Sequence, residues 1–108
     1  MNKGEVWLVE FPSSDGHEQT GTRPVIVLAE TDANLVIVVP LTSNVQALRF
    51  LHTLEIKSTK KNGLNASSIA LVFQVRALDK KRLQRQIGVL EESIQQQIDE
   101  LLKKVLRL

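Results

Sequence analysis

The residues with the clearest chemical potential lie between positions 16 and 28, in the stretch GHEQTGTRPVIVL. Arg23 and Pro24 stand directly before an apolar run, and His17 and Glu18 lie in the polar segment ahead of them. A guanidinium stays charged and offers a planar fork of donors to phosphate oxygens. Pro24 restricts Arg23 to extended backbone angles and so helps to aim its side chain. Binding and catalytic groups usually lie on loops carried by a rigid scaffold, so we expect a functional site here.

Two further residue types bear on this chemistry. Thr42 follows the strand end that Pro40 is expected to mark, and its hydroxyl can add a second donor to an oxyanion beside the guanidinium. Proton transfer needs a group that titrates near neutrality, and only His17 and His52 do so without perturbation. His52 lies in an apolar run and is interpreted as structural or exposed, whereas Glu18 is a candidate carboxylate base.

Length and composition limit the class of protein. A chain of 108 residues is expected to form one domain, residues 1–108. The absence of cysteine excludes a disulfide framework and a thiolate zinc site. We find neither a secretory signal nor a run of roughly 20 apolar residues that could span a bilayer. A cytoplasmic protein without membrane contact is therefore expected. The net charge of +2 is too small to indicate nucleic-acid binding by itself.

Apolar segments rich in β-branched and aromatic residues predict five strands, at residues 5–11, 24–30, 35–41, 50–56 and 67–73. The second and third are apolar at nearly every position, which indicates burial on both faces. Thr31–Asn34 is expected to join them as a hairpin turn. Residues 12–23 are predicted to form a polar loop.

Helices are predicted only in the last third of the chain. Asp79 is a candidate N-cap of a short helix that Gly88 would end. A second helix is expected from about Glu91, because apolar residues then recur on one face, at Ile94, Ile98, Leu101, Leu102 and Val105. Strands first and helices last predict an α+β fold, in which a strongly bent sheet or barrel is covered by the C-terminal helix.

From about Gly4 onward the chain resembles the MazF/PemK (Kid-like) family of toxins from bacterial type II toxin–antitoxin systems. The resemblance is carried by five successive segments, GEVWLVEF, GHEQTGTRPVIVL, VVPLTSN, FQVRALDKKRL and IGVLEESIQQQIDELL. It implies an SH3-like, CcdB-type small β-barrel of about five to seven strands with a C-terminal amphipathic helix. It also implies a homodimeric endoribonuclease that cuts single-stranded RNA at short sequences, uses no metal or other cofactor, and is silenced by a cognate antitoxin.

The resemblance also implies roles for particular residues. The family's catalytic pair, the arginine of G-x-R-P and the threonine of P-x-T-S, matches Arg23 and Thr42. The histidine of G-H-E-Q, which takes part in catalysis in the PemK/Kid branch, matches His17. Metal-free cleavage uses the neighbouring 2′-OH as nucleophile and leaves 2′,3′-cyclic phosphate and 5′-OH ends. Whether His17 or Glu18 acts as general base or general acid stays open.

Further residues are expected to contact the RNA, namely Gln19, Thr20, Ser43, Lys57, Lys60, Lys61, Gln74 and Arg76. Contacts of the lysines with the RNA backbone would make binding weaken as salt rises. One departure from the Kid branch stands out. That branch carries an arginine and an aspartate before its Q-x-R motif, and alignment on Gln74 places Leu71 and Phe73 there. The departure favours the arginine–threonine site typical of MazF.

Two other functions stay open. The related CcdB toxins share the barrel but bind DNA gyrase without cutting anything, and the G-T-R-P and P-L-T-S motifs speak against that role. The second is a catalytically inactive module that binds RNA or antitoxin. Incubation of the protein with a long RNA in EDTA distinguishes all three.

Overall fold

The computed structural model describes residues 1–11 and 21–108, and residues 12–20 lie outside the described part. Within it, seven strands succeed one another as β1 Glu5–Phe11, β2 Gly21–Glu30, β3 Leu35–Thr42, β4 Thr53–Ile56, β5 Ser68–Leu71, β6 Arg76–Asp79 and β7 Leu83–Val89. Short 3₁₀ helices span Val45–Arg49, Val72–Gln74 and Lys80–Arg82. The last element is the helix α1, Glu92–Leu106.

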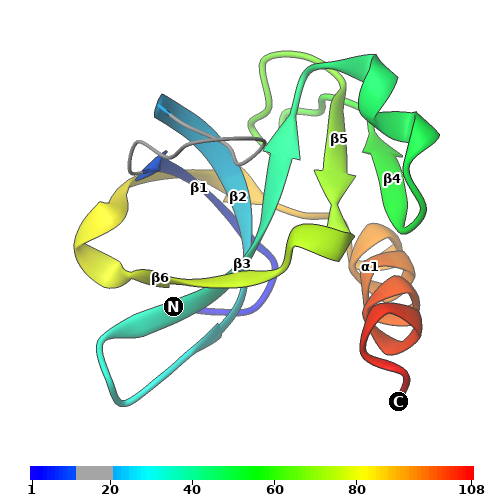
Figure 1. Cartoon of the computed structure of the whole chain (residues 1–108). Helices are drawn as coiled ribbons and strands as arrows, with labels where there is room; N and C mark the ends of the chain where they lie inside the picture. The colour runs from blue at the N-terminus through cyan, green and yellow to red at the C-terminus, as the bar shows by residue number, and fades with distance from the viewer. Residues whose placement is uncertain (12–20) are drawn as a thin grey trace.

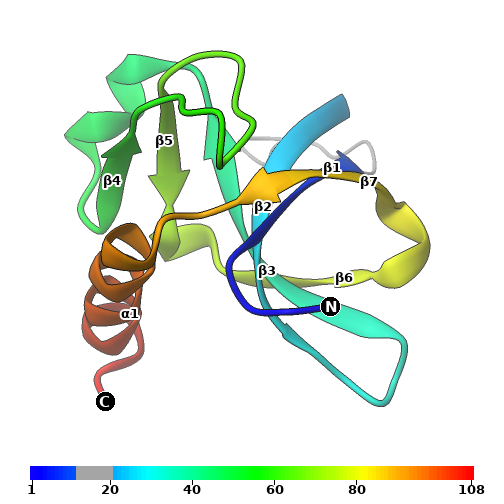
Figure 2. The same ribbon diagram turned by 180° about the vertical axis from the view of Figure 1, so that it is seen from behind.

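The strands form one antiparallel sheet in the order β4-β5-β3-β2-β1-β7, and β6 pairs with β3 beside this path. Figures 1 and 2 show that the sheet is strongly curled and that α1 lies at the side of β4 and β5. The pairings among the described residues leave the sheet open. The predicted α+β fold of five to seven strands with a C-terminal helix is confirmed, as a strongly bent sheet that does not close completely.

The central strands are buried on both faces, as their sequence predicted. Successive residues of a strand point to opposite faces, and in β2 this alternation sends Val25 and Val27 to one hydrophobic cluster and Ile26 to the other. In β3, Val38 and Val39 are divided in the same way. These two strands therefore form the rigid centre of the molecule.

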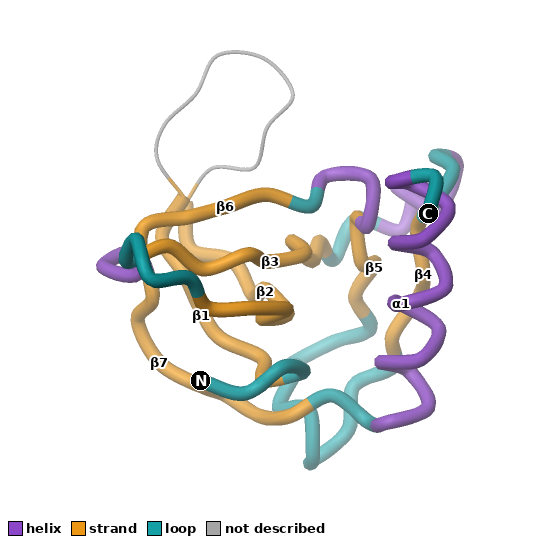
Figure 3. The backbone as a smooth tube through the Cα atoms, turned by 90° about the horizontal axis from the view of Figure 1, so that it is seen from below, coloured by secondary structure: helices purple, strands orange, loops and turns teal. Residues whose placement is uncertain are grey.

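The helix α1 covers one of these clusters. Ile98 is buried in it, and the other apolar residues of the predicted stripe are partly buried against it, namely Ile94, Leu101, Leu102 and Val105. The helix contacts β4 and the 3₁₀ helix Val72–Gln74, and Figure 3 shows it running beside β4 and β5. The predicted amphipathic helix is confirmed.

The predicted bounds of the central strands need two corrections. β2 begins at Gly21, so Arg23 lies inside the strand and not in a preceding loop. β3 continues through Pro40 and ends at Thr42. Its outer edge pairs with β6 up to Val38 and with β5 from Leu41 onward. Pro40 lies where the partner changes, and at that position the missing N–H is tolerated.

The short helix predicted between Asp79 and Gly88 is wrong. The Asp79 carboxylate does accept a hydrogen bond from the Lys81 amide at 3.0 Å, but it caps only a 3₁₀ turn. The chain then extends again as β7 and pairs with β1. Gly88 lies within this strand, where an added Cβ would approach the Asn62 carbonyl carbon to 2.4 Å. Close approach of two backbones, and not the end of a helix, explains the glycine.

The later strands are shorter than predicted. The strand expected at 50–56 is limited to β4, because Val45–Arg49 forms a 3₁₀ helix and His52 has a φ of 63°. The strand expected at 67–73 ends at Leu71, where the second 3₁₀ helix begins. Both changes leave Phe50 and Phe73 outside the sheet.

Candidate active site

The strand register brings Arg23 and Thr42 together. β2 and β3 are antiparallel, with Val25 opposite Pro40. Continuing this register by two residues sets Arg23 opposite Thr42. Residues that oppose each other in an antiparallel pair project to the same face, with Cβ atoms about 4.5–5.5 Å apart. Both residues line one cleft.

This cleft, which we call the Arg23 cleft, has a volume of about 620 Å³. Residues 22–24 of β2 line it opposite residues 41–44, which end β3 and continue beyond it. Leu64–Ala66 contribute another wall, from the connection between β4 and β5. Leu41 and Leu64 are buried, whereas Arg23 and Ser43 are exposed. The predicted residues Arg23, Thr42 and Ser43 therefore share a cleft that both apolar and polar residues line.

The Thr42 hydroxyl is oriented by the chain that follows it. The Asn44 amide donates to Thr42 Oγ1 at 3.2 Å, and the Asn44 side chain accepts from the Gln46 amide at 3.0 Å. A hydroxyl has one hydrogen to donate in addition to its two lone pairs. Because Oγ1 accepts from the backbone, its O–H hydrogen can donate toward the cleft.

Arg23 is exposed at the same cleft. Its Nη1 donates to the Thr22 carbonyl oxygen at 3.3 Å, so the guanidinium stays close to its own strand. Pro24, which precedes the buried Val25, lines the cleft beside it. Arginine and threonine thus present a permanent cation and a hydroxyl to the same space, which suits an anionic group on which charge increases during a reaction.

A second hollow lies next to the Arg23 cleft and shares Thr42 and Asn44 with it. We call it the Phe50 hollow; its volume is about 560 Å³, and Arg49, Phe50, Phe73 and the predicted residue Gln74 line it. Sequence reasoning assigned no role to Arg49 or Phe50 and noted Phe73 only as a departure from the Kid branch. The sequence signal that could have indicated this hollow is Arg49 followed by Phe50, a basic and then an aromatic residue soon after the P-L-T-S motif.

The other predicted RNA contacts lie elsewhere or outside the described residues. Lys57, Lys60 and Lys61 are exposed, but they are not among the described residues that line either space. Arg76 lies on β6 with its Cζ 5.4 Å from the centroid of the Phe11 ring. The remaining predicted residues fall in the segment 12–20, outside the described part of the chain, namely His17, Glu18, Gln19 and Thr20.

A buried amide holds the wall formed by Leu64–Ala66 in place. Asn62 is fully buried; its Oδ1 accepts from the Thr59 and Leu64 amides, and its Nδ2 donates to the Lys57 carbonyl and to Glu91. The Thr59 hydroxyl donates to Glu91 at 2.6 Å. This bond is the main cause that lowers the pKa of Glu91, with smaller contributions from Asn62 and the charge of Lys61.

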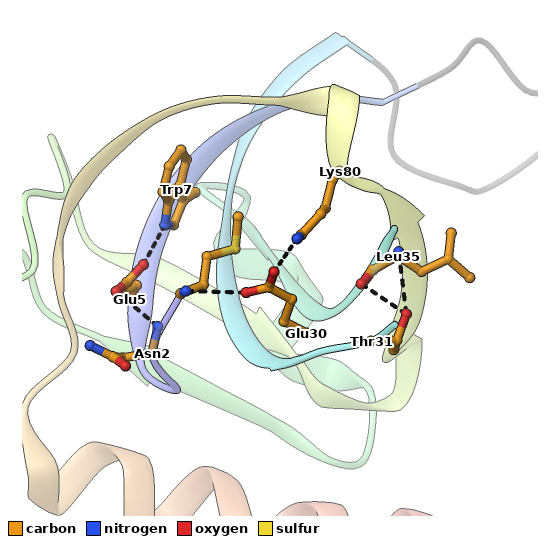
Figure 4. A network of polar contacts seen from close by, with 8 residues as sticks. Asn2, Glu5, Trp7, Glu30, Thr31, Leu35 and Lys80 are labelled. Atoms are coloured by element: carbon orange, nitrogen blue, oxygen red, sulfur yellow. Dashed lines mark hydrogen bonds and ion pairs between the residues drawn. The ribbon is translucent and has the colours of Figure 1, made fainter. Parts of the chain in front are cut away.

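A separate polar network lies at the far end of β2 (Figure 4). The amino terminus of Met1 donates to Glu30 at 3.1 Å, and Lys80 also forms an ion pair with Glu30. The bond with Lys80 is the main cause that lowers the pKa of Glu30. The Trp7 indole donates to Glu5 at 2.8 Å. These contacts join the N-terminus to the strands and lie away from the Arg23 cleft.

Residues 1–11 and 21–108 provide neither a metal-binding cluster nor a membrane-spanning helix. These residues include no group of three or more His, Asp or Glu side chains that could hold a metal ion. None of their helices has the length and apolar character needed to cross a membrane.

The chain forms a small curled antiparallel sheet with a cleft that Arg23 and Thr42 line, and comparison with known proteins identifies its family. Over residues 2–106 the sequence matches the family described as PemK-like, MazF-like toxin of type II toxin-antitoxin system. It is 33% identical over 106 residues to Endoribonuclease MazF of Staphylococcus epidermidis, covering 94% of this chain and 88% of that protein. The chain belongs to the PemK/MazF toxin family, which confirms the resemblance.

Solved structures share the fold. MazF (Form-I) from Deinococcus radiodurans matches with a TM-score of 0.81 at 22% identity, over 100% of this chain and 97% of that one. A mycobacterial endoribonuclease, solved in complex with its cognate antitoxin, matches with a TM-score of 0.70 at 16% identity, over 98% and 92% of the two chains. At these identities the likeness establishes the fold.

Proposed function

We propose that this toxin is a metal-independent, sequence-specific endoribonuclease that cleaves single-stranded RNA, messenger RNA above all. The observation that carries the proposal is the shared cleft of Arg23 and Thr42, two residues from different strands. The family supplies the class of activity, because a relative 33% identical to this chain is an endoribonuclease. Metal independence rests on the resemblance of the G-T-R-P and P-L-T-S motifs.

The proposed reaction is an in-line displacement at phosphorus. The 2′-oxygen loses its proton to a general base and forms a bond to phosphorus, while the bond from phosphorus to the 5′-oxygen breaks. The departing 5′-oxygen takes up a proton, which leaves 2′,3′-cyclic phosphate and 5′-OH ends. Negative charge gathers on the non-bridging oxygens, and donors from Arg23 and Thr42 stabilise it there.

Proton transfer is assigned to His17 and Glu18, and either of them can be the general base or the general acid. RNA contacts are assigned, as the sequence predicted, to Gln19, Thr20, Ser43, Lys57, Lys60, Lys61, Gln74 and Arg76. Single strands are the expected substrate, because sequence-specific reading of RNA depends on splayed bases and an A-form helix resists the in-line geometry.

The proposed partners follow from the family. We expect a cognate antitoxin, encoded alongside, to bind across the Arg23 cleft and block RNA. We also expect a homodimer and a cytoplasmic location. Co-purification with the antitoxin, followed by RNA cleavage with and without it, tests the inhibitory role.

The decisive experiment incubates the purified protein with a long mixed RNA in EDTA and maps the ends. We expect cuts at a short sequence with 2′,3′-cyclic phosphate ends. Arg23→Ala is expected to cut at least about 10²-fold more slowly, the usual effect of losing one oxyanion contact. Lys104→Ala removes one exposed charge from α1 and serves as the matched control.

The same experiment separates the alternatives. Intact RNA together with inhibition of DNA gyrase would establish the CcdB-like role. RNA that is bound but never cut would establish an inactive binding module. Cleavage that Arg23→Ala leaves unchanged would refute the assignment of the site.

A further inference from the structure

The Phe50 hollow contains two large aromatic side chains that the core does not cover. Phe50 follows the 3₁₀ helix Val45–Arg49, and Phe73 lies in the 3₁₀ helix Val72–Gln74. Their exposed fractions are 47% and 36%. The ring centroids are 5.5 Å apart and the ring planes are tilted by 49°. Two segments distant in sequence thus meet to form one exposed aromatic pair.

The polar groups around this pair are of particular kinds. The Arg49 Cζ lies 4.9 Å from the centroid of the Phe50 ring, so a cation sits beside the aromatic face. Gln74 brings a side-chain amide to the same hollow, and Asn44 brings another. Among the described lining residues Arg49 is the only charged one. Aromatic faces with a cation nearby bind the bases and backbone of single-stranded nucleic acid.

The hollow adjoins the proposed site of reaction. Thr42 and Asn44 line both the Phe50 hollow and the Arg23 cleft. The two spaces therefore share the wall at which the phosphate is proposed to lie. Phe73 takes the place at which the Kid branch carries an aspartate, so the residue that departs from that branch supplies half of the pair.

We propose that Phe50 and Phe73 form a stacking platform for one unpaired RNA base next to the scissile phosphate, and that the Gln74 amide reads the edge of that base. The inference rests on the proposed ribonuclease function and adds a specificity-determining site to it. Stacking accepts any base, because every base has a π-face. An amide offers both a donor and an acceptor to a base edge, so the preference for one base is assigned to Gln74.

The test uses the full chain and a single-stranded RNA that carries the mapped cleavage sequence, with a 2′-deoxy nucleotide that prevents the cut. Phe73→Ala is expected to weaken binding roughly 5- to 150-fold, the range for loss of stacking on one base. Phe73→Tyr keeps the ring and should bind like the wild type. Leu51→Ala is the matched control, because Leu51 is 80% exposed and lies outside the lining of the hollow.

A second comparison identifies the base. Replacing the base next to the scissile phosphate by an abasic ribonucleotide should weaken wild-type binding by at least the factor of Phe73→Ala, because the Phe50 and Gln74 contacts are lost as well. It should weaken binding by Phe73→Ala less than binding by the wild type, because the contact with Phe73 is then already lost. Gln74→Ala should broaden the preference at that position in end mapping of a mixed RNA pool.

Each outcome bears on the inference. If the wild type cuts RNA while Phe50→Ala and Phe73→Ala bind RNA normally, the platform is refuted and the ribonuclease proposal stands. If the two variants keep RNA affinity but lose self-association or antitoxin binding, the pair is a protein contact and the inference is wrong. If the wild type neither binds nor cuts RNA, both proposals fail together. Circular dichroism on each variant excludes unfolding as the cause of lost binding.

Discussion

Replacing Thr42 by valine tests the proposed cleft most sharply. Valine keeps the β-branched shape that suits the end of β3 and removes only the hydroxyl. Thr42→Ser keeps the hydroxyl and removes the methyl group. If the O–H donates to the phosphoryl oxygens, the serine variant retains most of the rate and the valine variant loses it.

The expected loss can be separated from any loss of stability. Removing one preorganised donor costs about 10²–10³ in rate, or about 2.7–4 kcal/mol. The structural contact that disappears is one hydrogen bond from the Asn44 amide, 3.2 Å long. Such a bond contributes about 0.5–1.5 kcal/mol net, and Asn44 is exposed, so water can replace it. The loss in rate should therefore exceed the loss in stability clearly.

The assay is single-turnover cleavage of an end-labelled RNA in EDTA, combined with urea unfolding of each variant. A double-mutant cycle with Arg23→Ala then measures the coupling of the two residues. Donors that hold the same phosphoryl group act as a unit, so the double variant should lose less than the product of the two single losses.

Two results would refute this reasoning. A Thr42→Val variant that cuts at the wild-type rate would remove the hydroxyl from the mechanism. Single losses that simply multiply in the double variant would show that Arg23 and Thr42 act on separate events, although they line one cleft.

Three further predictions concern the frame around the cleft. Asn62→Ala should lower the free energy of unfolding by roughly 2–6 kcal/mol in urea titrations, because the Leu64 amide and the Lys57 carbonyl lose their buried partner; an unchanged midpoint would contradict this role. Gly63→Ala should destabilise the protein far more than Gly21→Ala. Both glycines have a positive φ, which costs about 1–2 kcal/mol for alanine. Of the two, only Gly63 would place its added Cβ against backbone, 1.9 Å from the Ile87 carbonyl oxygen. Glu91→Gln should reduce the free energy of unfolding near pH 7, because a carboxyl group with a lowered pKa stabilises the fold only while it is ionised. The difference in stability from the wild type should disappear as the pH falls below 4.5 and through the lowered pKa of Glu91 in the folded protein. Glu92→Gln, on the exposed side of the same turn, is the control.

The parts of the fold that sequence reasoning predicted are those in which local pattern and burial agree. The runs 24–30 and 35–41 are rich in Val and Ile and apolar at nearly every position, so two-sided burial was the direct interpretation. The stripe around Ile98 repeats at helical spacing and can only be a helix face. The segment from Asp79 to Gly88 differs, because its capping signal fits a 3₁₀ turn as well as an α-helix. Pairing of Leu83–Val89 with β1, a contact distant in sequence, decided in favour of a strand.

The candidate site likewise has a part that the sequence predicted and a part that it did not. Arg23 and Thr42 were identified from motifs, and the strand register explains why two motifs separated in sequence lie at one cleft. The Phe50 hollow could not be predicted, because it depends on two 3₁₀ helices, one directly before an expected strand and one at the end of another. Phe50 and Phe73 read as ordinary apolar strand residues until the chain is seen to leave the sheet at both positions.

In the proposed mechanism, the position of Arg23 inside β2 makes the strand register a determinant of catalysis. A slip of one residue would turn every side chain of a strand to the opposite face, and it would move Arg23 away from Thr42. Burial of Val25, Ile26 and Val27 on two different faces opposes such a slip, because each register error would place the wrong side chain in both clusters. These two central strands therefore carry the two residues whose relative position the proposed chemistry needs. Substitutions that loosen the packing around Val25 should then reduce kcat before they unfold the protein, since they disturb the alignment of the pair at a smaller energetic cost than global unfolding.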